Sequence, residues 1–393
     1  MEADVYNRDI LANADDEDIL RERYPDIADW LPWPELKAAF LKAEGIAAAE
    51  KGKSQRYGRL AIWCALFSTA IIALTPALSI LAPVIGIGPE TVFGGYLAGV
   101  FRYGWIPFLA LSAWFGGHSL HGERRARWLE ARAQCERLRQ LFFQHLACWL
   151  PQLVSTDPND RTAALEARAA ALAHLREHYG SDGGAVVHRI VNDLDHRYWA
   201  LVEVPLRAWT GQTDPRVAAC LLRYIRDRRL AYQQRHASRQ VDCNALRSRQ
   251  SIFSRWSAQR RLMVTFGAAF VVFQWIIGVL YIVIDAFPAP PGPQGPQSLT
   301  SVVIYAQVAA TLSAAFVVAL KALEDGMQYR KDMMRYRTYG GITARITAKV
   351  DELIARTQAD LDRLRIYLLV MEELSYWEMR EFLTLHLDSE FST

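Results

Sequence analysis

Four long apolar runs dominate the pattern of hydrophobic and polar positions along the chain. They extend over Leu60–Gly88, Thr91–Gly117, Leu262–Ile284 and Ser301–Leu320. An α-helix rises about 1.5 Å per residue, so about 20 apolar residues cross a hydrocarbon core roughly 30 Å thick. The pattern predicts an all-α integral membrane protein with two transmembrane hairpins and long cytoplasmic helices extending from them. Its four spans are expected near residues 60–83, 97–118, 262–284 and 301–321.

Basic residues flank these runs at their outer ends only. The flanking residues include Lys51, Lys53, Arg56, Arg59, Arg124, Arg125, Arg127, Arg255, Arg260, Arg261, Lys321, Arg330 and Lys331. No Lys or Arg lies between Leu81 and Phe101, or between Leu262 and Leu320. Because Lys and Arg stay on the cytoplasmic side of a membrane, the sequence predicts a bacterial inner-membrane protein with both termini in the cytoplasm.

Outside these runs the sequence is polar and has a helical pattern. The whole chain divides into an acidic segment (1–33), a helix–hairpin–helix unit (34–150), a cytoplasmic helical insert (151–213), a second helix–hairpin–helix unit (214–386) and a tail (387–393). The two helix–hairpin–helix units share a layout, which suggests a repeat. Short alternating runs typical of β-strands are almost absent.

Three local patterns refine this outline. Apolar residues at helical spacing predict a buried stripe; they are Leu129, Leu138, Leu141, Phe142 and Leu146. Asp214 followed by Pro215 predicts a helix start, with an N-cap and a proline at the first helical position. Gly340 and Gly341 predict an interruption before the last long helix.

Composition and motifs provide little support for catalysis. Hydrophobic residues make up 51% of the 393 residues, the net charge is +3, and the five cysteines form no CxxC pair. The chain has no phosphate-binding Gly-rich loop with its lysine, no HExxH and no GxSxG. His174 and His178 stand one helical turn apart, but a metal site needs further ligands, and a solvated helix face is favoured. The sequence predicts a non-enzyme without metal or cofactor.

Polar residues within the apolar runs are candidates for lining a pore. They are Gln274, Gln307, Thr311 and Arg102. Such residues either hold helices together or face water in a channel. For Arg102, an interfacial anchor among aromatic residues is favoured over the lining of an outer vestibule.

The segment from Arg223 to Arg261 is rich in arginine. Arg228, Arg235 and Arg239 have spacings of seven and four, so on an α-helix they share one face. Guanidinium groups suit phosphate, which makes these residues candidates for an anionic ligand. Pairing of the segment's arginines with acidic residues of neighbouring helices is the alternative.

The architecture resembles a known family. A two-span hairpin between long helices, ending in the segment Met371–Met379 with Glu372, Glu373 and Trp377, is similar to the SLATT proteins. These are membrane effector domains of bacterial nucleotide-signalling defence systems, thought to form pores. The resemblance implies no catalytic residues.

Together these patterns predict a membrane effector that oligomerises into a pore or channel and perturbs the inner membrane, with bacterial antiviral defence as the expected setting. The expected partners are the lipid bilayer, further copies of the chain, and a nucleotide signal or cytoplasmic protein; specific nucleic-acid binding is not expected. The alternative is a non-enzymatic membrane scaffold that anchors a cytoplasmic partner protein or enzyme.

Overall fold

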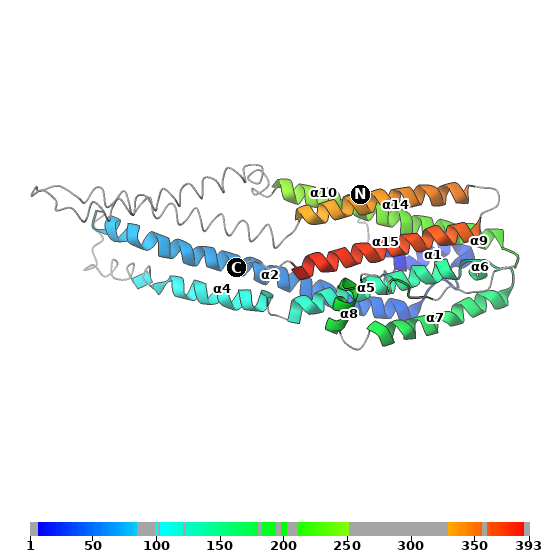
Figure 1. Cartoon of the computed structure of the whole chain (residues 1–393), viewed down its shortest axis with the longest axis horizontal. Helices are drawn as coiled ribbons and strands as arrows, with labels where there is room; N and C mark the ends of the chain where they lie inside the picture. Colours follow the sequence, from blue (N-terminus) through cyan, green and yellow to red (C-terminus); the bar gives the residue numbers. More distant parts are fainter. Residues whose placement is uncertain are drawn as a thin grey trace, which may run out of the picture. The chain divides into compact units, whose positions relative to one another are not determined.

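The computed structural model describes most of the chain as helices (Figure 1). The described residues are 7–84, 99–100, 103–120, 123–179, 183–193, 198–202, 211–250, 329–355 and 360–388. They fall into two compact units. Unit 1 comprises Met1–Gly52, Glu123–Ala245 and Arg330–Asp388, and unit 2 comprises Lys53–Gly122, Leu246–Tyr329 and Ser389–Thr393.

Unit 1 contains most of the described helices. In chain order they are η1 (Arg8–Ile10), α1 (Asp16–Arg23), η2 (Pro25–Ile27), the first part of α2 (Pro34–Val84), α5 (Glu123–Cys148), α6 (Leu150–Leu153), α7 (Pro158–Tyr179), α8 (Gly183–Val191), α9 (Pro215–Tyr224), η3 (Ile225–Leu230), most of α10 (Ala231–Gln250), α14 (Tyr329–Ile354) and α15 (Leu361–Asp388). The predicted helical character is confirmed for these residues. The β-pairing among them is an isolated bridge between Ser155 and Thr213.

Helix α5 lies at the centre of unit 1. It packs along α15 and contacts α8, α6 and α7 (Figure 1). The predicted apolar stripe is confirmed, because all its members are buried: Leu129, Leu138, Leu141, Phe142 and Leu146. Burial of large aliphatic and aromatic side chains stabilises a fold by about 1.5–3 kcal/mol each. The α5–α15 contact is therefore the main apolar core of the unit.

The N-terminal segment is part of this core. Its apolar side chains Leu20, Tyr24, Ile27, Leu31 and Trp33 are all buried. The segment is also held by hydrogen bonds from the buried Arg168 on α7 to the carbonyl oxygens of Trp30 (2.8 Å) and Pro32 (3.2 Å). Although acidic, it is a structural element of unit 1.

The helix start at Asp214 is confirmed. The Asp214 carboxylate accepts hydrogen bonds from the amides of Arg216 (2.9 Å) and Val217 (3.3 Å), and Pro215 is the first helical residue. This cap satisfies amides that have no partner within the helix. The helix then continues into a π-helical stretch, η3, which the sequence pattern did not predict.

The predicted interruption at Gly340-Gly341 is wrong. Helix α14 continues through both residues. A Cβ atom at Gly340 would lie 3.2 Å from the Cβ of Ala237 on α10, whereas one at Gly341 would meet nothing within 4 Å. Gly340 therefore allows α14 and α10 to approach closely.

The described part of unit 2 is a hairpin of α2 and α4 (Trp105–Leu120). Ser68 donates a hydrogen bond to the carbonyl oxygen of Trp105 (3.1 Å), and Ser112 donates one to that of Ala61 (2.9 Å). Phe67 contacts Phe108, with ring centroids 6.0 Å apart. One face of each helix is thus used for packing against the other.

The predicted membrane architecture is contradicted by these helices. Among the residues that the structure describes, none of the helices is both sufficiently long and sufficiently apolar to cross a membrane.

The corrections concern the fold class and the localisation. The four-span integral membrane fold and the inner-membrane localisation are wrong by this finding. The apolar runs near 60–83 and 97–118 contribute instead to the hairpin of α2 and α4, within which their side chains pack together. The runs near 262–284 and 301–321 lie outside the described residues.

Candidate functional site

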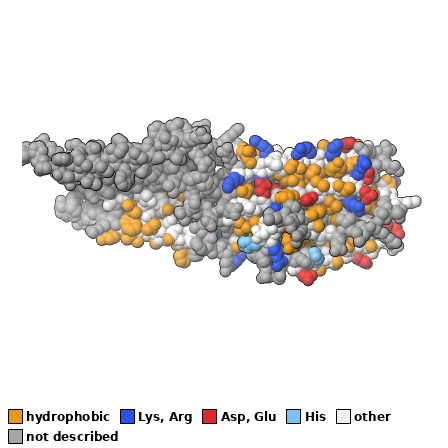
Figure 2. Space-filling view, viewed as in Figure 1, with side chains coloured by type: hydrophobic (Ala, Val, Ile, Leu, Met, Phe, Trp, Pro, Cys, Tyr) orange, Lys and Arg blue, Asp and Glu red, His pale blue; other side chains and the backbone are white. Residues whose placement is uncertain are grey.

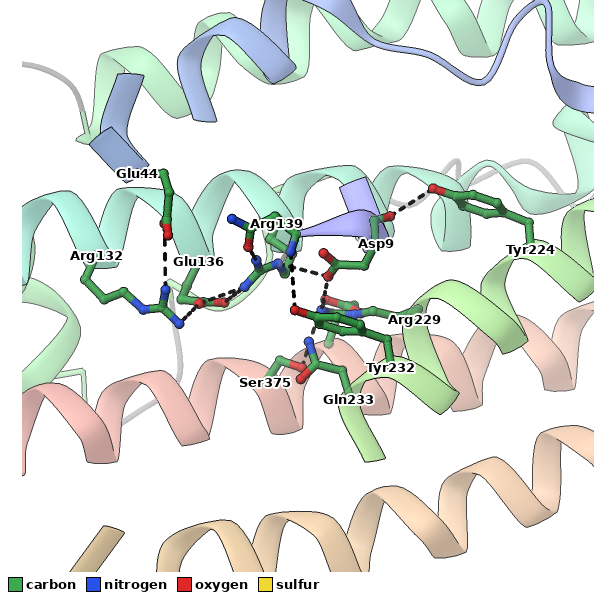
Figure 3. Close-up of polar contacts among 12 residues, drawn as sticks. Asp9, Glu44, Arg132, Glu136, Arg139, Tyr224, Arg229, Tyr232, Gln233 and Ser375 are labelled. Carbon is green, nitrogen blue, oxygen red and sulfur yellow. Dashed lines mark hydrogen bonds and ion pairs between the residues drawn. The ribbon is translucent and has the colours of Figure 1, made fainter. Parts of the chain in front are cut away.

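A chain of buried and half-buried ionic groups crosses unit 1 (Figure 3). We call it the arginine–carboxylate network; its members are Asp9, Glu44, Arg132, Glu136, Arg139, Arg229 and Glu372. They come from η1, α2, α5, η3 and α15, so the network joins segments far apart in the sequence. Charges in a protein interior are costly unless they are paired and hydrogen-bonded.

Arg229 and Glu372 form the best-aligned pair of the network. Arg229 Nε and Nη2 donate to the two carboxylate oxygens of Glu372 at 2.8 and 2.6 Å, and both side chains are buried. Nη2 also donates to Ser375 Oγ at 3.1 Å. The guanidinium lies over the ring of Phe143, 4.6 Å from its centroid. This bidentate geometry fixes η3 on α15.

Glu136 forms the second well-made pair. Its two oxygens accept from Arg139 Nη1 at 2.8 Å each, and one oxygen lies 2.5 Å from Arg132 Nη2. Although burial opposes ionisation, Arg132 and Arg139 lower the pKa of Glu136 to about 2. Glu136 is therefore a carboxylate at neutral pH, and it accepts hydrogen bonds without being a proton donor.

Asp9 lies between Arg139 and Arg229. Its Oδ2 is 2.9 Å from Arg139 Nε and 3.6 Å from Arg229 Nη1, and the side chain is fully buried. Asn7 supports this position, because its Oδ1 accepts from Arg139 Nη2 at 2.6 Å. The phenol of Tyr224 donates to the Asp9 carbonyl oxygen at 2.9 Å.

A small polar cavity of about 30 Å³ adjoins the network. Its lining comes from α5, α10, α14 and α15 and consists of Arg132, Glu136, Arg139, Tyr232, Gln233, His236, Tyr336, Tyr339 and Glu378. A volume of this size holds about one or two water molecules. Burial and the charges of Arg132 and Arg139 lower the pKa of His236 to about 4, so its imidazole is neutral at pH 7.

Three of the five cysteines are shielded from solvent. Cys135, Cys148 and Cys220 are buried free thiols, whereas Cys64 and Cys243 are half-buried, and burial raises the pKa of Cys148 to about 12. A thiol that remains protonated is a poor nucleophile. Among the described residues no group of three or more His, Cys, Asp or Glu side chains is arranged to hold a metal ion. His174 is exposed on α7, and the side chain of His178 lies outside the described residues.

The structure does not present the predicted anionic-ligand residues as one face. Arg228 belongs to η3 and is half-buried, whereas Arg235 and Arg239 are exposed on α10. Arg235 Nε donates to the carbonyl oxygen of Ala231 in its own helix at 3.2 Å. The alternative, pairing with acidic residues of other helices, describes Arg229 and Arg226.

The predicted pore-lining residues are not described by the structure. Gln274, Gln307, Thr311 and Arg102 all lie outside the described residues. Their proposed roles therefore stay predictions without a structural account.

The hairpin of α2 and α4 exposes an apolar surface. More than half of the large hydrophobic side chains that are exposed among the described residues lie between Leu60 and Trp114. We call these residues the apolar hairpin surface: Leu60, Trp63, Phe67, Ile72, Leu74, Val100, Tyr103, Ile106, Leu109, Leu111 and Trp114. Figure 2 shows apolar side chains along α4 on the face in view.

The sequence pattern gave a partial view of these sites. In the sequence, Glu372 stands out only as part of the segment Met371–Met379. Asp9 is one acidic residue of an acidic segment, and Arg229 is one arginine of an arginine-rich segment. A weak signal for Arg229 was its position among the apolar residues Ile225 and Leu230, which are buried with it.

Comparisons with known proteins add no relationship to these observations. No protein-family model, curated protein or solved structure matches the chain. The resemblance to the SLATT proteins stays a prediction that rests on architecture and on the segment Met371–Met379.

Proposed function

We propose that this protein is a non-enzymatic helical assembly protein, in which the apolar hairpin surface binds the same surface of a second copy. The observation that carries the proposal is the exposure of large apolar side chains on both helices of the hairpin, with Trp114 at 61% and Phe67 at 53%. Single exposed apolar residues are common on proteins, whereas contiguous apolar patches mark interaction sites.

The faces that α2 and α4 turn toward each other do not explain this exposure. Those faces contain Ser68, Phe108 and Ser112, which are buried or half-buried. Ile106, Leu109 and Trp114 on α4 remain exposed. Two helical hairpins that share such surfaces form a four-helix arrangement, which is a common way to bury apolar stripes. A two-fold interface uses one patch on both copies, so a single self-complementary surface is sufficient.

Unit 1 suits the role of a rigid body in such an assembly. Its helices are joined by a large apolar core and by the arginine–carboxylate network. The predicted pore depended on the membrane architecture that the described helices contradict, and it is not retained. In the scaffold alternative, without its membrane anchor, the apolar hairpin surface would bind a different protein. The test below distinguishes that outcome from self-association.

The proposal is tested by the mass of the purified full-length chain in solution. The chain has a mass of 44.5 kDa, and mass photometry is expected to show a dimer or larger assembly. The double substitution Ile106→Ser and Leu109→Ser is expected to shift the population to the monomer. Both side chains are about half exposed, so the circular dichroism spectrum is expected to retain its helical form.

A matched control is Ile366→Ser on α15 in unit 1. Ile366 is 56% exposed, so it has comparable accessibility but lies outside the apolar hairpin surface. This variant is expected to keep the assembly state of the wild type. A wild-type chain that is monomeric at all concentrations, or an assembly that the double substitution leaves intact, contradicts self-association. A monomer that captures another protein through this surface supports the scaffold instead.

A further inference from the structure

Helices α10 and α14 expose far more positive than negative charge. Their described, solvent-exposed charged side chains are six cations and two carboxylates. The carboxylates are Asp242 and Glu352, and Glu352 is paired with Lys349 at 3.0 Å. Figure 2 shows blue Lys and Arg side chains along the upper edge of unit 1, where α10 and α14 lie in Figure 1. We call the six cations the basic face: Arg235, Arg239, Lys331, Arg337, Arg345 and Lys349.

The packing of the two helices directs these cations to solvent. The Tyr339 hydroxyl of α14 donates to Gln233 Oε1 of α10 at 3.3 Å, and both side chains are buried. An α-helix turns by about 100° per residue, so two residues beyond a buried position the side chain lies on the opposite side. Arg235 stands two residues after Gln233, and Arg337 stands two residues before Tyr339. Both arginines are therefore on the outer sides of a packed helix pair, and both are exposed.

Several members of the basic face have no acidic partner in the fold. Within the part of the chain that the structure describes, Lys331, Arg337 and Arg345 form no salt bridge. Arg335 of the same helix differs, because it is buried and lies 3.3 Å from both Asp332 and Glu378. The cations that α14 uses to pack against α15 are thus distinct from those that it turns to solvent.

The acidic N-terminal segment is not a good partner for the basic face of another copy. Three of its exposed carboxylates already form ion pairs within the chain. These pairs are Asp15–Arg8 at 2.9 Å, Glu17–Lys37 at 3.4 Å and Asp18–Arg21 at 3.3 Å. They would have to break before the segment could neutralise arginines of a second copy. A polyanion whose charges are not already paired within a fold suits the basic face better.

The dimensions of the basic face fit a phosphate backbone. Lys331 and Lys349 are 18 residues apart on one straight helix, which corresponds to about 27 Å. A strand of duplex DNA covers that distance in about eight phosphates, at about 3.4 Å each. Proteins that bind single strands also stack bases on aromatic side chains, whereas the exposed large apolar residue among the described side chains of α14 is Met334. The surface therefore favours a duplex over a single strand.

We propose that the basic face binds the phosphate backbone of double-stranded nucleic acid without recognising its base sequence. Ammonium and guanidinium groups that neutralise phosphates release bound counterions, and this release drives association. Contacts with phosphates position a protein on a duplex but provide no sequence information. The basic face belongs to unit 1 and the hairpin of α2 and α4 to unit 2, so the proposal does not depend on self-association.

Fluorescence anisotropy of the full-length chain with a labelled DNA duplex of about 20 base pairs, over twice the length of the basic face, tests the proposal. We expect binding at low salt that weakens as salt increases. The logarithm of the association constant is expected to fall linearly with the logarithm of the salt concentration. The slope is about −0.9 per phosphate contact, which gives about −4 to −5 for five or six contacts. Two duplexes of unrelated sequence are expected to bind equally.

The double variant Arg337→Gln with Arg345→Gln removes two of these contacts. It is expected to reduce the magnitude of the slope by about 2 and to weaken binding by about tenfold per lost contact near 0.1 M salt. Arg337→Lys with Arg345→Lys keeps both charges and is expected to retain the slope. The matched control, Arg176→Gln with Arg363→Gln, removes the same charge from exposed positions on α7 and α15 and is expected to bind as the wild type.

The side chains changed in these variants are all exposed, so unchanged thermal unfolding is expected and separates lost binding from lost folding. A wild-type chain that does not bind the duplex at low salt overturns the proposal. So does wild-type affinity in Arg337→Gln with Arg345→Gln, or an equal loss in the matched control, because net charge would then account for binding. Tighter binding of a single strand than of the duplex also contradicts it. Binding of a poly-glutamate peptide by a chain that ignores the duplex would assign the basic face to an acidic protein instead.

Discussion

Arg229 is a buried cation that depends on its partner Glu372. Its guanidinium is buried and donates two hydrogen bonds to Glu372. Removing one member of a buried ion pair leaves an unmatched charge and costs about 3–5 kcal/mol. By contrast, replacing an exposed charge changes the free energy of unfolding by no more than roughly 0.5 kcal/mol.

Glu372→Gln is therefore expected to lower the free energy of unfolding by about 3–5 kcal/mol, measured by urea denaturation. The matched control is Glu381→Gln, which changes an exposed carboxylate on the same helix α15. We expect that control to change stability by less than about 0.5 kcal/mol. Equal stabilities of the two variants would mean that the Arg229–Glu372 pair does not hold η3 on α15.

His145 gives the fold a distinct pH dependence. It is fully buried between the rings of Trp33 and Trp149. Burial and the charge of Arg168 lower its pKa to about 3. The unfolded chain, with a histidine pKa of about 6.5, binds a proton between these values that the folded chain does not bind. The contribution of neutral His145 to the free energy of unfolding is fully present above pH 6.5 and is lost as the pH falls below that value.

The stability of the wild type relative to His145→Phe is expected to decrease by up to about 1.4 kcal/mol for each pH unit below about 6.5. Thermal or urea unfolding of both proteins between pH 7 and pH 4.5 measures this difference. His174→Gln, on the exposed face of α7, is the control and is expected to follow the wild type. A constant difference between wild type and His145→Phe across this range would show that His145 titrates normally in the fold.

At the scale of elements, the two adjacent glycines of α14 have opposite roles. Glycine within a helix costs about 0.5–1 kcal/mol relative to alanine because it loses more backbone freedom on folding. At Gly341 nothing opposes a side chain, whereas at Gly340 a Cβ would crowd Ala237 of α10. Gly340 is thus required for the close approach of two helices.

Gly341→Ala is expected to raise the free energy of unfolding by about 0.5–1 kcal/mol. Gly340→Val is expected to lower it by about 1–3 kcal/mol, the usual cost of an overpacked contact. The two changes lie in one helix, so thermal unfolding of the pair provides an internal comparison. Stabilisation by both substitutions would show that α10 and α14 are not in close contact.

The elements also show what the sequence could predict. Helical periodicity identified the buried stripe of α5, and the Asp214-Pro215 pair identified the start of α9, because both signals are local. The π-helix η3 and the continuity of α14 through Gly340 depend on contacts with other helices. Side-chain propensity alone could not predict them.

At the scale of the whole molecule, unit 1 depends on its N-terminal segment. Residues Ile10, Leu11, Leu20, Tyr24, Ile27, Leu31 and Trp33 are all buried. At about 1.5–3 kcal/mol each, their burial amounts to roughly 10–20 kcal/mol, which is comparable with the whole stability of a typical domain.

Deletion of residues 1–33 is therefore expected to abolish the cooperative unfolding transition, monitored by tryptophan fluorescence during urea denaturation. Co-expression of residues 1–33 as a separate fragment is expected to restore it in part, because the lost contacts are supplied in trans. A truncated chain that unfolds cooperatively with wild-type stability would contradict a structural role for the segment.

Long-range pairing limited the prediction of the candidate site. The network joins Asp9 to Arg229 and Arg229 to Glu372, and nothing in the spacing of these residues relates them. The apolar runs are evident in the sequence, and their length predicts membrane spans, which the described helices contradict. Hydropathy alone does not distinguish an apolar helix that spans a membrane from one that packs in a hairpin, such as α4 against α2.

Contact between the hairpins of two copies is the central claim, and site-specific photo-crosslinking tests it most directly. A benzophenone amino acid at position 109 of α4, on the apolar hairpin surface, is compared with one at position 366 of α15. The proposal predicts a crosslinked species of two chains from position 109 only, with the crosslink mapped by mass spectrometry to α2 or α4 of the other copy. Crosslinks from position 109 to unit 1 or to another protein, or no crosslinked pair at all, would contradict it.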